Sequence, residues 1–138
     1  MYAIRELGKE YASDIKLYVG FEAEYIPEFF KEHKAMFDRL GCDYMIMGQH
    51  FMKSEQTGPY TGTPTDDESR IREYVDTVIE GMKTGMYSYL AHPDLINYQG
   101  LDSVYEWEMT RMCKALKELD IPRACFQSLC RQAVCMVR

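Results

Sequence analysis

The sequence predicts an α/β fold made of about three successive strand-helix units. Segments in which every second residue is apolar alternate with segments whose apolar residues recur at helical spacing, and Gly or Pro residues mark the boundaries. Alternating strands and helices of this kind favour a parallel sheet or barrel. The 138 residues have the length of one domain, 1–138, and 46% apolar residues suffice to bury a core.

The first unit begins with a strand over about 15–25. Its apolar residues follow the period of two that a strand requires, at Ile15, Leu17, Val19 and Phe21. Glu22 shares the opposite face with Gly20. A helix then starts at Pro27, because a residue without an N–H suits the first turn, and Gly41 ends this helix.

The second unit has a short strand over 43–48 that is followed by Gln49 and His50. The segment 51–65 is rich in Gly, Pro, Thr and Ser, which predicts a long surface loop. Thr65 and Glu68 have the spacing of a capping box at the start of a helix. The apolar stripe of that helix consists of Ile71, Tyr74, Val75, Val78, Ile79 and Met82.

The third unit follows Gly85 and contains a short strand over 88–91 that delivers His92 at its end. Ser103 and Glu106 have capping-box spacing and predict the start of another helix. Its stripe consists of Tyr105, Met109, Met112, Leu116 and Leu119. A further strand is expected to begin at 121–122.

Each of the three strands thus ends in a side chain that can bind a metal: Glu22, His50 and His92. In a parallel sheet or barrel these strand ends lie on one rim, so residues far apart in sequence converge there. A carboxylate and two imidazoles suit zinc, manganese or iron. Taken singly, each residue has a simpler interpretation, because Glu22 could end an edge strand, His50 could be exposed in a loop and His92 could cap a turn.

Two other side chains have less specific patterns. His33 lies at helical spacing within the first helix, and we interpret it as a packed histidine with its hydrogen bonds satisfied. Glu24 shares a strand face with Glu22 and offers a second carboxylate, but we expect a solvated position beyond the strand end. The residues that carry out catalysis, apart from metal binding, cannot be named from the sequence.

Composition excludes several classes of protein. The net charge of −6 disfavours broad electrostatic binding of nucleic acid. No apolar run reaches the roughly 20 residues of a membrane span, and no secretory signal is present, so we expect a cytoplasmic protein that does not bind membranes. Five cysteines without a CxxC pair indicate reduced thiols and no zinc finger.

Three short motifs, in this order and spacing, resemble those of the polymerase and histidinol-phosphatase (PHP) family, most closely its histidinol-phosphatase branch. They are Gly-Phe-Glu at 20–22, Met-Gly-Gln-His at 47–50 and Leu-Ala-His-Pro-Asp at 90–94. The resemblance covers 1–122 and leaves 123–138 as an atypical tail. The N-terminal His-x-His and the C-terminal Asp-x-His motifs of the family are absent, so we interpret the chain as a fragment of that fold.

The resemblance implies a partial, distorted β/α barrel of the PHP type that holds divalent metal. Glu22 would bridge two metals, His50 and His92 would complete the ligand set of one, and Asp94 would steady the loop of His92. The tail, with cysteines at five-residue spacing, matches no family strand. We interpret it as the end of a gene fragment or of a shifted reading frame.

The implied activity is hydrolysis of a small-molecule phosphate ester, histidinol phosphate, to histidinol and phosphate in histidine biosynthesis. This activity would be weak or absent if the missing ligands are essential. Two alternatives stay open. One is a PHP phosphatase that acts on another phosphoester. The other is a non-catalytic, metal-binding or oligomerising remnant that forms a homo-oligomer through its open sheet edges.

Overall fold

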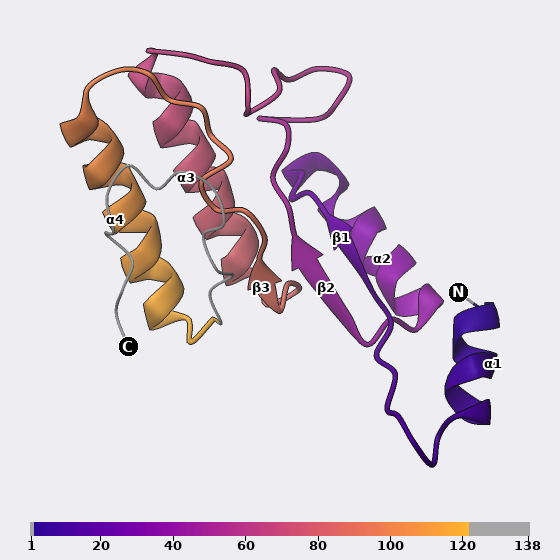
Figure 1. Ribbon diagram of the computed structural model, residues 1–138. Helices are drawn as coiled ribbons and strands as arrows, with labels where there is room; N and C mark the ends of the chain where they lie inside the picture. Colours follow the sequence, from indigo (N-terminus) through magenta and orange to yellow (C-terminus); the bar gives the residue numbers. More distant parts are fainter. Residues whose placement is uncertain (1, 122–138) are drawn as a thin grey trace.

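The computed structural model describes residues 2–121, and the expected strand beyond 121 and the tail 123–138 lie outside that part (Figure 1). Helices and strands alternate along most of the chain, as α1 (Tyr2–Glu10), β1 (Gly20–Ala23), η1 (Pro27–Phe29), α2 (Phe30–Leu40), β2 (Tyr44–Met47), α3 (Glu68–Lys83), β3 (Tyr89–Leu90) and α4 (Asp102–Glu118). The three predicted strand-helix units are therefore present.

The strands form one parallel sheet in the order β1-β2-β3, with β2 in the centre. In the register between β1 and β2, Glu22 lies opposite Ile46, and between β2 and β3, Met47 lies opposite Leu90. All three strands point the same way, so their carboxyl ends meet at one edge (Figure 1). The α/β prediction is confirmed, whereas the described residues form an open sheet and the barrel stays a prediction.

Strand β1 is shorter than the predicted 15–25. The ladder begins where Gly20 pairs with Tyr44, and just before it the Asp43 carboxylate accepts the N–H of Val19 at 2.7 Å. The carbonyl of Val19 in turn accepts the N–H of Asp43 at 2.8 Å, so one backbone bond and one side-chain bond close the start of the ladder. The alternating residues before 20 have no partner strand among the described residues, and Ile15 is 51% exposed. Helix α1, which precedes this segment, was not predicted.

Helix α2 follows the prediction closely. Pro27 opens a short 3-10 turn, and Gly41 ends the helix in the left-handed conformation, with φ of 61°. No residue of α2 is fully buried. On this helix the Nδ1 atom of His33 is buried without a hydrogen-bond partner among the described residues, so the expectation of a satisfied histidine is wrong for that atom.

Helices α3 and α4 lie side by side over one side of the sheet and enclose most of the core (Figure 1). All six residues of the predicted α3 stripe are buried, and so are Met109, Met112 and Leu116 of α4. Gly81 lets α3 approach β2 and the segment after β1 closely, since a Cβ at that position would lie 2.7 Å from Cβ of Tyr25 and 2.8 Å from Cε of Met47. None of the described helices is both long and apolar enough to cross a membrane.

The predicted capping boxes are wrong in both helices. Asp67 caps α3 by accepting the N–H of Ser69 at 2.8 Å, because Thr65 is engaged two residues earlier in a bridge with Tyr98. Helix α4 starts at Asp102, so Ser103 lies inside its first turn.

The cysteine expectation holds only in part. Cys42 is a free thiol, whereas Cys113 on α4 is disulfide-bonded, so the expectation of reduced thiols is wrong for Cys113.

Candidate metal centre

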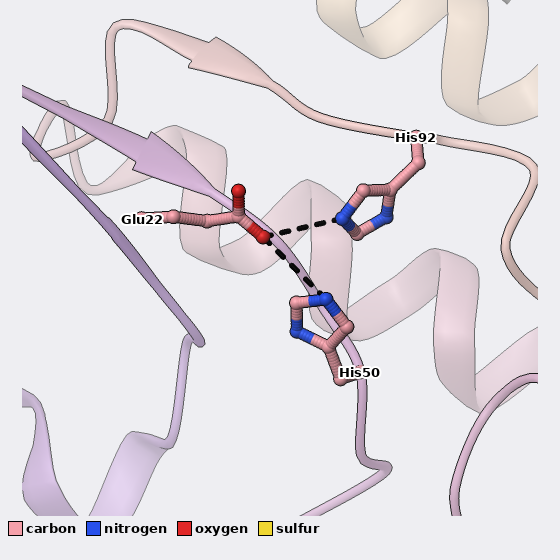
Figure 2. Close-up of side chains that lie close together, drawn as sticks. All are labelled: Glu22, His50 and His92. Atoms are coloured by element: carbon pink, nitrogen blue, oxygen red, sulfur yellow. Dashed lines mark hydrogen bonds and ion pairs between the residues drawn. The ribbon is translucent and has the colours of Figure 1, made fainter. Parts of the chain in front are cut away.

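Glu22, His50 and His92 lie together at the carboxyl edge of the sheet. Oε1 of Glu22 is 3.2 Å from Nε2 of His92 and 3.5 Å from Nε2 of His50. Figure 2 shows the carboxylate pointing between the two imidazole rings. Glu22 comes from β1, while His50 and His92 follow β2 and β3. The structure therefore brings together residues from three separate strand ends, as the topology requires.

The spacing of these donors suits a metal ion. Bonds of about 2.0–2.2 Å at tetrahedral angles place neighbouring donors about 3.4 Å apart. The two measured separations, 3.2 and 3.5 Å, bracket that value, and donor atoms of all three side chains lie within 4.8 Å of one another. The same distances also fit ion pairs between Glu22 and protonated imidazoles, in the absence of metal. The geometry thus permits both a metal centre and a charged cluster.

Gly48 makes room for the Glu22 carboxylate. A Cβ at residue 48 would lie 2.7 Å from the carboxyl carbon of Glu22, where real Cβ atoms essentially never lie. Since Gly48 directly follows β2 and Glu22 is opposite Ile46, the carboxylate crosses from β1 over the end of β2. A side chain at residue 48 would displace the Glu22 carboxylate from this position, so Gly48 shapes the site although it contributes no donor.

His50 is fixed by hydrogen bonds to its backbone from both sides. Oε1 of Glu24 accepts the N–H groups of His50 and Phe51 at 3.0 and 3.1 Å, and Thr61 donates its N–H to the carbonyl of His50 at 2.8 Å. The Glu24 side chain is only 18% exposed, so the expectation of a solvated position is wrong. Burial raises the pKa of this carboxyl group, and the amides of His50 and Phe51 partly oppose that rise.

Gln49 joins the two loops that follow β1 and β2. Its side chain is fully buried, with Oε1 accepting the N–H of Tyr25 at 3.0 Å and Nε2 donating to the carbonyl of Phe51 at 2.7 Å. A buried amide that satisfies its donors and acceptor in this way holds two segments in one arrangement. Gln49 was not predicted as a site residue, and its position between Gly48 and His50 is the only signal that the sequence offers.

His92 is placed by its backbone. Its φ of 31° lies in the left-handed region, which residues with a side chain adopt at a cost, and such strain concentrates at functional sites. The conformation is held on both sides, because Ala91 donates its N–H to Met47 and Tyr74 donates its hydroxyl to the carbonyl of Pro93 at 3.2 Å. Nδ1 of His92 is buried and has no hydrogen-bond partner among the described residues.

Asp94 and His33 lie outside the cluster. Asp94 lines a neighbouring cavity of about 420 Å³ together with Tyr60 and Asn97, and its influence on the His92 loop stays a prediction. His33 packs near Phe29, with ring centroids 6.3 Å apart. Among residues 2–121, the three predicted ligands form the one group of His, Cys, Asp or Glu side chains arranged to hold a metal ion.

Comparisons with known proteins support the fold. The crystal structure of histidinol phosphate phosphatase from Lactococcus lactis subsp. lactis Il1403, complexed with zinc, L-histidinol and phosphate, is similar with a TM-score of 0.65 and 18% sequence identity. The match covers 88% of this chain and 50% of that one, so the chain spans half the length of the protein it resembles. No family model and no curated protein sequence matches. The likeness is therefore one of fold.

Proposed function

We propose that the chain binds a divalent metal through Glu22, His50 and His92 and acts as a metal-dependent phosphomonoester hydrolase of the PHP type. The observation that carries the proposal is the convergence of these three donors, from three parallel strand ends, at separations of 3.2 and 3.5 Å that suit one ion. Zinc, manganese and iron all fit a carboxylate with two imidazoles. Zinc is the first choice, because the structurally similar phosphatase was crystallised with it.

The three side chains are suited to hold the ion and to leave it accessible. Three protein donors leave at least one coordination position for water or a phosphate oxygen, and each side chain of the cluster is about one third or more exposed. A bound divalent ion supplies charge for phosphate oxygens and lowers the pKa of a coordinated water. A hollow of about 380 Å³ beside Glu22 and His50 has room for a small ester.

The proposed substrate is histidinol phosphate, which would place the chain in histidine biosynthesis and in the cytoplasm. Two facts support this choice: the resemblance of the three motifs to the histidinol-phosphatase branch, and the L-histidinol and phosphate bound to the similar structure. A PHP phosphatase with another phosphoester as substrate has the same metal site. A panel of phosphomonoesters, compared at equal concentration, distinguishes the two.

A second candidate function is a non-catalytic, metal-binding or oligomerising protein. It is favoured by the open edges of the described sheet, since β1 and β3 each pair on one side only. Large exposed apolar side chains also cluster around α1 and β1, namely Ile4, Leu7, Tyr11, Ile15, Leu17, Tyr18 and Phe21. Gel filtration with light scattering tests the oligomerising form of this candidate, because a monomer at micromolar concentration would contradict it.

The decisive experiment measures bound metal and phosphate release on the same preparations. The purified chain is loaded with zinc or manganese, its metal content is determined, and release from histidinol phosphate is followed. His92→Ala is expected to lose both, whereas His33→Gln, which changes a histidine outside the cluster, is expected to keep both. Metal binding without release supports the non-catalytic candidate. Equal metal content in wild type and His92→Ala rules out the proposed site.

A further inference from the structure

His50 lies between two glutamates that come from the same segment of chain. Its Nε2 atom is 3.5 Å from Oε1 of Glu22 in β1, and its Nδ1 atom is 3.5 Å from Oε1 of Glu24, two residues later. The two ring nitrogens of His50 therefore face two different carboxylates. From this arrangement we propose that Glu24 is a positioning residue, which fixes the orientation and tautomer of His50. The inference rests on the metal site proposed above.

Glu24 is itself held in place by several segments. Its Oε1 atom accepts two successive backbone N–H groups, those of His50 and Phe51, at 3.0 and 3.1 Å. Its own carbonyl accepts the hydroxyl of Tyr87 at 3.0 Å, just before β3. The Glu24 side chain is 18% exposed, compared with 42% for Glu22. Glu24 is thus a fixed and partly buried charge, while Glu22 is the carboxylate that faces outward.

The chemistry of imidazole gives this fixed charge its consequence. A neutral imidazole carries a proton on one nitrogen and binds a metal through the other, and the partner of the first nitrogen decides which is which. Glu22 lies equally close to Nε2, but Glu24 is fixed and more buried, so its charge is less screened by water and favours the tautomer with the proton on Nδ1. The lone pair of Nε2 is then directed toward Glu22, where the ion would bind.

His92 shows why this role belongs to Glu24 in particular. Its Nδ1 atom has no hydrogen-bond partner among residues 2–121, and its ring is directed by a left-handed backbone and the following proline. The two imidazoles of the cluster are therefore oriented by different means. Both rings face Glu22 through Nε2, but His50 is the one whose Nδ1 atom also faces a carboxylate, so loss of the Glu24 charge is expected to affect His50 and spare His92.

The matched test is Glu24→Gln in the full chain. Glutamine keeps an oxygen that accepts the N–H groups of His50 and Phe51, but it removes the negative charge beside Nδ1. We expect the zinc dissociation constant to rise about 10- to 100-fold, as for other partners of metal-bound histidines. Glu32→Gln, which changes an exposed carboxylate of α2, is expected to leave the constant unchanged.

A second readout separates positioning from general structure. Ring nitrogen NMR of the metal-free chain, at a pH where His50 is neutral, reports which nitrogen carries the proton. Wild type is expected to hold it on Nδ1 of His50, and Glu24→Gln is expected to move population to Nε2 while His92 keeps its signals. A wild-type His50 protonated on Nε2 overturns the inference even if the variant fails to fold, and so does an unchanged zinc affinity in a folded variant. A wild type that binds no zinc refutes the proposed function instead, and the tautomer measurement then still decides the role of Glu24.

Discussion

The substitution Gly48→Ala tests the placement of Glu22 without touching any donor atom. The added Cβ would lie 2.7 Å from the carboxyl carbon of Glu22, whereas an ordinary van der Waals contact begins at 3.4 Å. Oε1 of Glu22 lies closer still, so the carboxylate must retreat by at least about 0.7 Å, the difference between these distances. Metal-ligand bonds tolerate deviations of only about 0.2 Å. Glu22 is thus expected to be lost as a ligand in this variant.

The size of the effect can be estimated from the part of the zinc-binding free energy that one ligand contributes. Structural zinc sites with four ligands contribute about 10–16 kcal/mol, which is about 3 kcal/mol for each ligand. Since every 1.4 kcal/mol changes an equilibrium constant about tenfold, the zinc dissociation constant should rise about 100-fold. Phosphate release, if the chain is an active hydrolase, should fall with the occupancy of the site, by about tenfold at a zinc concentration about ten times the wild-type dissociation constant.

The assay is a zinc titration in competition with a chromophoric chelator, with urea unfolding of the same samples. Gly41→Ala is the matched control, because Gly41 has a φ of 61° and no atom within 4 Å of its missing Cβ. That control is expected to lose about 1–2 kcal/mol of stability through backbone strain and to keep its zinc affinity. A folded Gly48→Ala chain with wild-type zinc affinity would refute the placement of Glu22 as a ligand.

Three further changes test the scaffold. Met112→Ala, at a fully buried position of α4, should lower the free energy of unfolding by about 2–5 kcal/mol in urea titrations, and a loss below 1 kcal/mol would contradict the core described above. Tyr74→Phe removes the hydrogen bond to Pro93 and should cost about 1 kcal/mol, with weaker zinc binding through the His92 loop; unchanged values of both would dismiss that bond as a support. Hydrogen bonds from Ser69 lower the pKa of Asp67 in the folded protein below its usual 3.8. The carboxylate therefore stabilises the folded protein at pH values above 3.8. This stabilisation is lost as the pH falls through the lower pKa of the folded state. Asp67→Asn caps without a titrating group, and the urea midpoint of wild type should therefore fall relative to this variant between pH 6 and about pH 3, whereas parallel midpoints would contradict the assignment.

The parts of the fold that depend on periodicity could be predicted from the sequence. The buried stripe of α3 follows from helical spacing alone, and Gly41 ends α2 because it can adopt a positive φ. The convergence of Glu22 and His92 needed one more step, the rule that carboxyl ends of parallel strands share an edge. Local pattern together with topology was enough for these features.

Features that depend on contacts between distant segments could not be predicted. The strand pattern predicts that Glu24 is exposed to solvent. In the structure, its carboxylate instead accepts the backbone N–H groups of two loop residues that lie 26 and 27 positions later in the chain. The requirement for glycine at residue 48 arises from a side chain on another strand. Both helix N-caps were misplaced by two residues, and for α3 the reason is that Thr65 takes part in a bridge that the local sequence does not reveal.

The bond between Glu22 and His92 joins residues that are 70 positions apart in the chain. β2 lies between β1 and β3, so an intermediate in which only neighbouring units have paired holds at most two of the three donors. Metal capture during refolding is therefore expected to coincide with the last kinetic phase, when the third strand joins. A stopped-flow experiment with a zinc-sensitive dye would follow this event directly, and zinc uptake in the first phase would contradict it. Three scattered donors would then make the ion a chemical reporter of the moment at which the sheet is complete.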